Sequence, residues 1–175
     1  MADTIAGVPP QLAHLSWLIG TWEGDGLGEY PTVERFAFRQ RVEFACDGRP
    51  FLSYTSTTWI LDEDGERLRR GASESGFWRP APDNGVEVLL SHPTGYAEVW
   101  LGQVTVTALE TAKITGAKLE LVTDVVARTD TAKDYSGGQR LYGLVNGQLL
   151  WTFDMIAMGQ PLANHLWAQL NPVVG

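Results

Sequence analysis

The number and spacing of the histidines and of the single cysteine limit the kinds of metal or catalytic site that this chain can form. The 175-residue chain contains three histidines, His14, His92 and His165, and one cysteine, Cys46. No two histidines have the i, i+4 spacing of a metalloprotease site, and one cysteine cannot form a Cys-based zinc site or an intrachain disulfide. A lone histidine can still bind the iron of a haem, because the porphyrin supplies four other ligands. The histidines therefore predict single-ligand chemistry rather than a metal cluster.

His165 lies in the stretch GQPLANHLWAQL, residues 159–170. On composition alone, a histidine among leucines and a tryptophan is interpreted as a packing residue. Pro161 suits a first helical position, and Leu162, Leu166 and Leu170 follow at i, i+4 and i+8, so the stretch predicts a short helical segment. Of the other histidines, His14 is expected at a helix surface or core edge. His92, before a proline in SHPTG, is expected to stabilise a turn, with the rim of a pocket as the alternative.

The remaining polar residues give weaker signals. Lys133, in the polar stretch TDTAKDYSGGQR, is interpreted as an exposed lysine or as a cation that meets a ligand carboxylate. Nothing singles out a glycosidase pair among the carboxylates. Glu23, Asp25 and Glu29 are predicted to lie on the solvent face of a strand. No Gly-x-Ser-x-Gly motif indicates an α/β-hydrolase, and Cys46 is predicted to be a small buried apolar group.

The stretch GTWEGDGLGEYP, residues 20–31, has glycines at alternating positions. A nucleotide-binding loop would need a strand before it and a helix after it, and neither is indicated here. Glycines with a period of two instead leave one strand face without side chains, which permits tight curvature or the close approach of a flat ligand or another strand. We therefore interpret this stretch as a strand.

Length and charge limit the class of protein. The chain is the size of one domain, which we assign to residues 1–175, and its net charge of −8 argues against nucleic acid or an anionic membrane as a partner. No stretch approaches the roughly 20 apolar residues of a membrane span, and the first residues do not resemble a secretory signal. The single cysteine fits a reducing compartment, so we expect a cytoplasmic protein.

The elements that must position these residues read as β-strands joined by short turns. Turn signals occur at Asp47-Gly48, Asp64-Gly65, Asn84-Gly85, Thr94-Gly95, Gly137-Gly138 and Asn146-Gly147. Between them, residues 51–61 alternate well, with Leu52, Tyr54, Ser56, Thr58 and Ile60 on one face. About eight to ten antiparallel strands predict a closed all-β barrel. A helix over residues 9–20, with Leu12, Leu15 and Ile19 on one stripe, is expected to plug one end.

The segments LIGTWEGDGLGEYPT and GQPLANHLWAQL together resemble the nitrobindin family, and FLSYTSTT, ESGFWRP and SHPTG resemble family segments in the same order. The resemblance spans nearly the whole chain. It implies a ten-stranded antiparallel barrel, related to fatty-acid-binding proteins and lipocalins. The short helical segments predicted above from residue spacing would lie near the two ends of the chain. Gly20, Trp22, Gly24 and Gly26 match the family signature, which is not itself a ligand set.

The resemblance also implies a function and a cofactor. Family members bind one haem b per chain, and their axial histidine maps onto His165, with further haem contacts at Thr32 and Lys133. They are described as peroxynitrite isomerases, which convert peroxynitrite to nitrate at ferric iron, and as homodimers. Two alternatives stay open: a haem or nitric-oxide carrier or sensor without turnover, and a metal-free fatty-acid carrier. The second would need a cation deep in the barrel, for which Arg79 and Arg140 are candidates.

Overall fold

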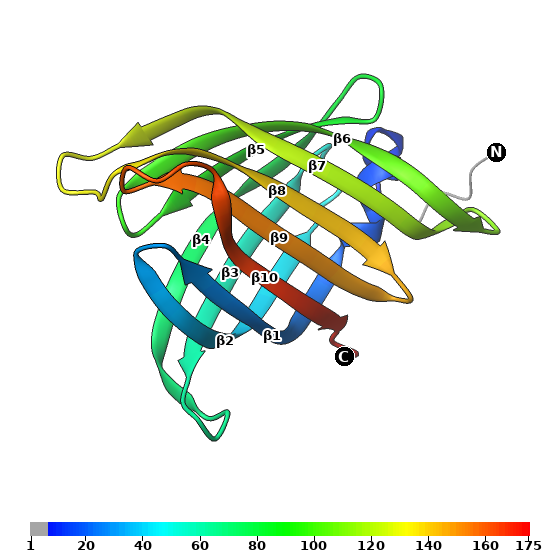
Figure 1. The fold of residues 1–175 in the computed structure, drawn as a ribbon. Helices are drawn as coiled ribbons and strands as arrows, with labels where there is room; N and C mark the ends of the chain where they lie inside the picture. The colour runs from blue at the N-terminus through cyan, green and yellow to red at the C-terminus, as the bar shows by residue number, and fades with distance from the viewer. Residues whose placement is uncertain (1–6) are drawn as a thin grey trace.

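The computed structural model describes residues 7–175, and these form a closed antiparallel barrel (Figure 1). A short 3₁₀ helix, η1 (Pro10–Leu18), precedes ten strands. The strands are β1 (Gly20–Tyr30), β2 (Val33–Ala45), β3 (Leu52–Leu61), β4 (Arg67–Ala81), β5 (Gly85–His92), β6 (Tyr96–Glu110), β7 (Lys113–Arg128), β8 (Tyr135–Val145), β9 (Gln148–Ala157) and β10 (Ala163–Pro172). Each strand pairs with the next in sequence, and β1 pairs with β10 to close the barrel. The predicted ten-stranded barrel is confirmed.

The predicted helix over residues 161–170 is wrong, because this segment is strand β10. A spacing of four residues is also a multiple of two, so leucines at 166 and 170 fit one face of a strand as well as one face of a helix. Pairing decides between them. Gly28 pairs with Leu166 and Gly24 pairs with Leu170, so β10 satisfies its backbone hydrogen bonds with β1 on one side and β9 on the other.

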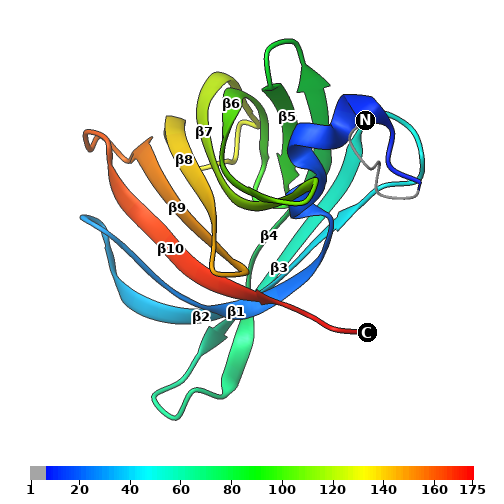
Figure 2. The same ribbon diagram turned by 90° about the vertical axis from the view of Figure 1, so that its right-hand side faces the viewer.

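The predicted N-terminal helix forms, but as a 3₁₀ helix at one end of the barrel (Figure 2). Leu12, Leu15 and Leu18 are fully buried, and their spacing of three matches the three residues per turn of this helix. Trp22 Nε1 donates to Leu18 O and so ties β1 to the helix. His14 Nε2 contacts Gly85 O at 2.8 Å, the core-edge position expected for it.

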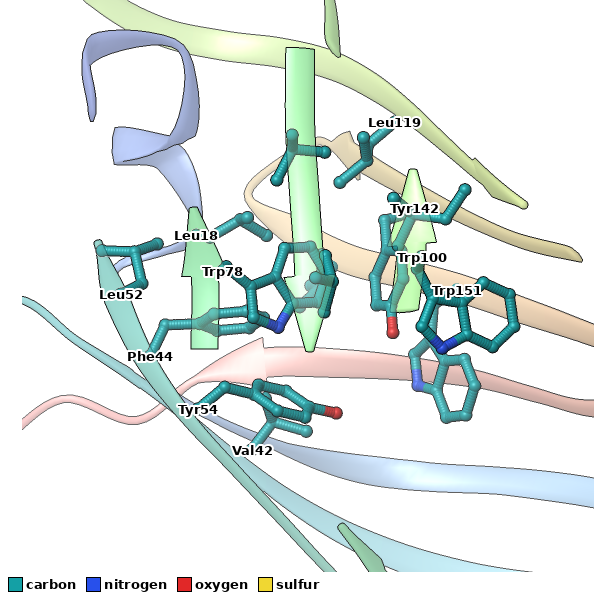
Figure 3. Close-up of a cluster of buried hydrophobic side chains, with 14 of the residues drawn as sticks. Leu18, Val42, Phe44, Leu52, Tyr54, Trp78, Trp100, Leu119, Tyr142 and Trp151 are labelled. Atoms are coloured by element: carbon teal, nitrogen blue, oxygen red, sulfur yellow. The ribbon is translucent and has the colours of Figure 1, made fainter. Parts of the chain in front are cut away.

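Aromatic side chains fill the interior of the barrel next to this helix (Figure 3). Trp78 is fully buried, and its ring meets those of Phe44 at 5.0 Å and Tyr142 at 5.3 Å, both edge to face. Such pairs contribute roughly 0.5–1.5 kcal/mol each beyond area burial. Cys46 packs against the edge of this core and is only partly buried, contrary to its prediction as a buried group. No helix within residues 7–175 is long and apolar enough to cross a membrane.

Most of the predicted turns join strands, with one exception. Gly137-Gly138 lies inside β8, next to a register shift between Tyr135 and Gly137. A Cβ at Gly138 would lie 2.5 Å from Asp154 O of the paired strand, so the glycine serves a close strand contact rather than a turn.

The signature glycines bring strands close together. A Cβ at Gly24 would lie 2.1 Å from Gln169 O, and one at Gly26 would lie 2.4 Å from Trp167 O, both on β10. Of the three possibilities given for this stretch (tight curvature, a flat ligand or another strand), the structure shows the close approach of another strand. The barrel closes where these glycines lie.

We expect Gly24→Ala to lower the free energy of unfolding by about 1–3 kcal/mol, because a backbone oxygen in a closed barrel cannot move aside cheaply. Urea unfolding followed by tryptophan fluorescence measures the change. Gly143→Ala is the matched control, since the nearest atom to a Cβ there is 3.8 Å away. Equal unfolding midpoints for the two variants would contradict this account.

Candidate functional site

A cavity of about 570 Å³ lies at the end of the barrel opposite η1, and we call it the mouth cavity. Its walls include the aromatic side chains of Phe36, Phe38, Trp151 and Phe153, and polar groups from β4, β5, β6 and β8. The volume lies within the range of roughly 300–1,000 Å³ typical of small-molecule and cofactor sites. A larger hollow of about 950 Å³ lies on the outer surface around Leu27 and contains none of the predicted ligand-binding residues.

A β-bulge directs His165 into the mouth cavity. Asn164 pairs with Asp154 and Leu166 pairs with Phe153, so His165 is an extra residue between two paired positions. Strict alternation would place His165 and Leu166 on opposite faces, but both line the cavity. Bulges commonly redirect a side chain in this way.

The imidazole of His165 is held at one nitrogen and free at the other. Its Nδ1 lies 3.0 Å from Glu29 O, which can only accept, so Nδ1 carries the proton and donates. Among residues 7–175, Nε2 has no hydrogen-bond partner. Burial lowers the pKa of His165, against a smaller opposing effect of the Glu29 carbonyl. The side chain is therefore a neutral imidazole at pH 7, the form that binds metals.

Three aromatic rings surround this imidazole edge to face. Tyr30 lies 5.8 Å away, Phe153 6.0 Å and Phe36 6.4 Å, measured between ring centroids. Tyr30 is itself fixed, since its hydroxyl bonds to the backbone of Ala157 as both donor and acceptor. The rings restrict His165 to one orientation and keep its surroundings apolar.

The rim of the mouth cavity carries the other predicted ligand contacts. Thr32, in the β1–β2 turn, and Lys133, in the β7–β8 loop, line the same cavity as His165. Arg69 is a further cation at the rim that the sequence did not reveal. It pairs with the inward-facing Ile60 across β3 and β4. Neither the Lys133 nor the Arg69 side chain has an ion-pair partner in the described part of the chain.

The signature residues Gly20, Trp22, Gly24 and Gly26 do not line the mouth cavity. Trp22 is buried near η1, at the other end of β1. The predicted solvent-face carboxylates are confirmed as exposed, in ion pairs with arginines of β2: Glu23 with Arg41, Asp25 with Arg39 and Glu29 with Arg35.

A buried ion pair forms the floor of the mouth cavity. Arg140 donates to both carboxylate oxygens of Glu74, at 2.7 and 2.8 Å, and Tyr54 donates to the same carboxylate at 2.7 Å. Burial raises the pKa of Glu74, but attraction to Arg140 and its hydrogen bonds outweigh burial and lower the pKa to about 2. The carboxylate is therefore ionised and committed to Arg140.

The ion pair of Arg140 with Glu74 argues against the alternative function as a metal-free fatty-acid carrier. Arg140 is already neutralised by Glu74, so it does not offer a free cation to a fatty-acid carboxylate. Arg79 is exposed and follows the inward-facing Trp78, so its side chain lies on the outer surface. Neither candidate fits the role that this alternative requires.

A second buried carboxylate, Glu98, lies in the cavity wall. Tyr135 donates its hydroxyl to Glu98 Oε2, and His92 Nε2 bonds to Glu98 Oε1. His92 therefore occupies a pocket wall, the alternative to its predicted turn role. Glu98 is not among the residues predicted from the sequence, although its spacing of two from Trp100 places both residues on the inward face of β6. Within residues 7–175, no group of three or more His, Cys, Asp and Glu residues is arranged to hold a metal ion.

The fold and the site together define a class: a closed antiparallel barrel that presents one imidazole nitrogen in a cofactor-sized cavity. Residues 11–171 match the family described as the THAP4-like, heme-binding beta-barrel domain. The chain belongs to this haem-binding β-barrel family. The predicted resemblance to nitrobindins is thereby confirmed, since curated relatives carry that name.

Individual relatives are similar over nearly their whole length. A protein of Nocardioides sp. (strain ATCC BAA-499 / JS614), named peroxynitrite isomerase, is 50% identical over 92% of each chain. A ferric nitrobindin-like protein of Kineococcus radiotolerans is 45% identical over 94% of each chain. The crystal structure of Rv2717c from M. tuberculosis has a TM-score of 0.86 and 35% identity, covering 95% of this chain and 99% of that one.

Proposed function

We propose that this protein binds one haem b through His165 and isomerises peroxynitrite to nitrate at the ferric iron. One observation carries the proposal: His165 Nε2 is free in the mouth cavity while Nδ1 is held by Glu29 O. The names of the Nocardioides and Salinispora tropica relatives, both peroxynitrite isomerase, support the reaction.

The residues of the mouth cavity fit a haem. A porphyrin is flat and largely apolar, and the walls offer Phe36, Phe153 and Met155. Its two propionates are anionic, and the rim offers the cations Lys133 and Arg69 and the hydroxyl of Thr32. The donor set also fits, because a neutral imidazole with an oriented Nδ1–H is a good iron ligand.

In this proposal the haem iron supplies the redox-active centre at which the oxygen–oxygen bond of peroxynitrite rearranges. The chain supplies ligation, orientation and confinement. His165 Nε2 binds the iron, and Glu29 O fixes the ring through Nδ1. Tyr30, Phe36 and Phe153 surround the imidazole edge to face, and no group within residues 7–175 hydrogen-bonds to Nε2, so this nitrogen is available to the iron.

Haem titration of the purified protein tests binding, followed by the Soret band with one equivalent as the expected endpoint. Stopped-flow mixing of the ferric protein with peroxynitrite then tests turnover, and we expect faster loss of peroxynitrite with nitrate as the product. Haem uptake without acceleration would contradict the isomerase and leave the haem or nitric-oxide carrier or sensor. Failure to take up haem would contradict both.

We expect Lys133→Gln and Arg69→Gln each to weaken haem affinity roughly two- to five-fold, the usual contribution of an exposed ion pair. Titration with haem dimethyl ester, which has no free carboxylates, should show no difference between these variants and the wild type. Arg67→Gln is the matched control, because Arg67 stacks on Trp59 at 3.9 Å on the outer surface. A weakened affinity for the ester as well would show that the substitutions disturb the cavity instead.

We also propose the finer assignments that the resemblance and composition imply: a single domain over residues 1–175, a cytoplasmic location and a homodimer. A largely apolar row on the outer face supports the dimer: Leu27 pairs with Trp167, and Thr152 lies between Trp167 and Leu141. Sedimentation velocity at micromolar concentration measures the oligomeric state. A monomer there would contradict the dimer.

A further inference from the structure

His92 and His165 face the mouth cavity from opposite walls. His92 ends β5 and His165 lies in β10, and these strands are five positions apart in a ring of ten (Figure 2). Both side chains line the cavity. A small molecule held on the far side of a group bound to His165 would therefore meet the wall that carries His92.

Glu98 and Tyr135 hold His92 in place. The Glu98 side chain is only 1% exposed, and its two oxygens are used by His92 Nε2 and the Tyr135 hydroxyl. Burial, and next the charge of Glu98, raise the pKa of Tyr135, so the phenol stays protonated and donates. Glu98 is then an acceptor at both oxygens, and the His92 ring carries its proton on Nε2. This is the arrangement by which a buried carboxylate orients an imidazole for proton transfer at its other nitrogen.

The other nitrogen, Nδ1, has no hydrogen-bond partner within residues 7–175. It lies 3.6 Å from Glu74 Oε2, which is too long for a hydrogen bond. Glu74 is in any case engaged by Arg140 and Tyr54. Nδ1 is therefore the atom of His92 that can exchange a proton or a hydrogen bond with a molecule in the cavity.

We propose that His92 Nδ1 is the hydrogen-bonding and proton-exchanging group for a small anion bound in the mouth cavity opposite His165. The inference rests on the proposed function, since it concerns a ligand of the haem-loaded protein. Peroxynitrite is a small anion rich in acceptor oxygens, so a protonated Nδ1 would donate to it as it binds. The dyad of His92 and Glu98 would then orient the anion and exchange a proton with it.

The charges around His92 are balanced in a way that favours this role. From β4 it faces Glu74, and Arg140 of β8 neutralises that carboxylate. From β6 it faces Glu98 and the ring of Tyr96, whose centroid is 6.1 Å away. An entering anion is repelled by Glu98 unless His92 carries the compensating proton, so anion binding and protonation of His92 should be coupled.

The test uses fluoride as the probe anion and ferric, haem-loaded protein. Fluoride accepts hydrogen bonds, and the charge-transfer band of its ferric complex shifts when a donor is lost. We expect His92→Leu to shift this band and to weaken fluoride binding roughly ten-fold or more, the usual effect of losing a hydrogen bond to a charged group. We expect His92→Gln, which cannot titrate, to remove one protonation step from the pH dependence of fluoride affinity. The Gln variant also covers the case in which His92→Leu fails to fold.

His14→Gln is the matched control, because His14 contacts Gly85 at the far end of the same strand, β5. It should leave fluoride binding, the band position and the pH profile unchanged. Normal haem uptake by the His92 variants with a wild-type fluoride band and pH profile would overturn this inference alone. A wild-type protein that does not take up haem would overturn the proposed function, and this inference with it.

Discussion

Purified His165→Ala is expected to bind no haem under conditions in which the wild type shows a full Soret band. The substitution removes His165 Nε2, the ring nitrogen that we propose binds the haem iron in the mouth cavity. The barrel should still fold, because His165 is an unpaired bulge residue whose loss costs no strand pairing. Far-ultraviolet circular dichroism and urea unfolding check the fold beside the titration.

Added imidazole should restore ligation in His165→Ala, since the variant leaves a ring-shaped space between Tyr30, Phe36 and Phe153. Recovery of the wild-type spectrum with imidazole would show that the variant lost a ligand rather than a cavity. His14→Ala, at the η1 end, is the control and should load haem normally. Retention of haem by His165→Ala with an unchanged Soret band would show that the ligand assignment is wrong.

Glu74→Gln is expected to lower the free energy of unfolding by about 3–5 kcal/mol, because it leaves the Arg140 charge buried without its partner. The Arg140 side chain is 3% exposed and cannot turn to water. This loss is a large part of the roughly 5–15 kcal/mol that stabilises a typical domain. Urea unfolding measures it. Glu23→Gln, which breaks an exposed pair with Arg41, should cost less than about 1 kcal/mol.

A double variant separates the pair from its surroundings. Glu74→Gln combined with Arg140→Met removes both charges, so we expect it to recover much of the stability that Glu74→Gln loses. If the double variant is no more stable than Glu74→Gln, the lost stability comes mainly from the hydrogen bonds that Tyr54 and Tyr142 form with this pair.

The pair of Glu74 and Arg140 also makes the stability of the fold depend on pH in the acid range. The pKa of Glu74 falls from its usual 4.5 to about 2 in the folded protein, so its stabilising effect is full above pH 4.5 and is lost as the pH falls toward 2. The wild type should lose stability steeply across this interval. Glu74→Gln should lose less across the same interval, because it has no carboxyl to protonate there. Parallel acid-unfolding curves for the two proteins would contradict the assignment.

Pattern and composition determined the class of this protein. Leu52, Tyr54 and Ser56 alternate with other residues at a spacing of two, which is the repeat of a β-strand. Glycine-containing turns separate such segments along the chain, so local sequence patterns were enough to predict strands and a barrel. The family motifs singled out His165, Thr32 and Lys133, and the structure places all three around one cavity. Periodicity failed at residues 161–170, because a spacing of four residues fits a helix and a strand alike.

Only the tertiary structure decided how the site is built. The bulge that turns His165 inward, the Glu29 carbonyl that holds its Nδ1, and the inward face shared by Glu74, Glu98, His92 and Arg140 all depend on strand register. Between β1 and β10, which lie far apart in the chain, no hairpin turn fixes the register, so this pairing is decided only when the barrel closes. The sequence by itself determined that this is a barrel with one candidate ligand histidine. Long-range pairing decided that this histidine faces a second one across the cavity.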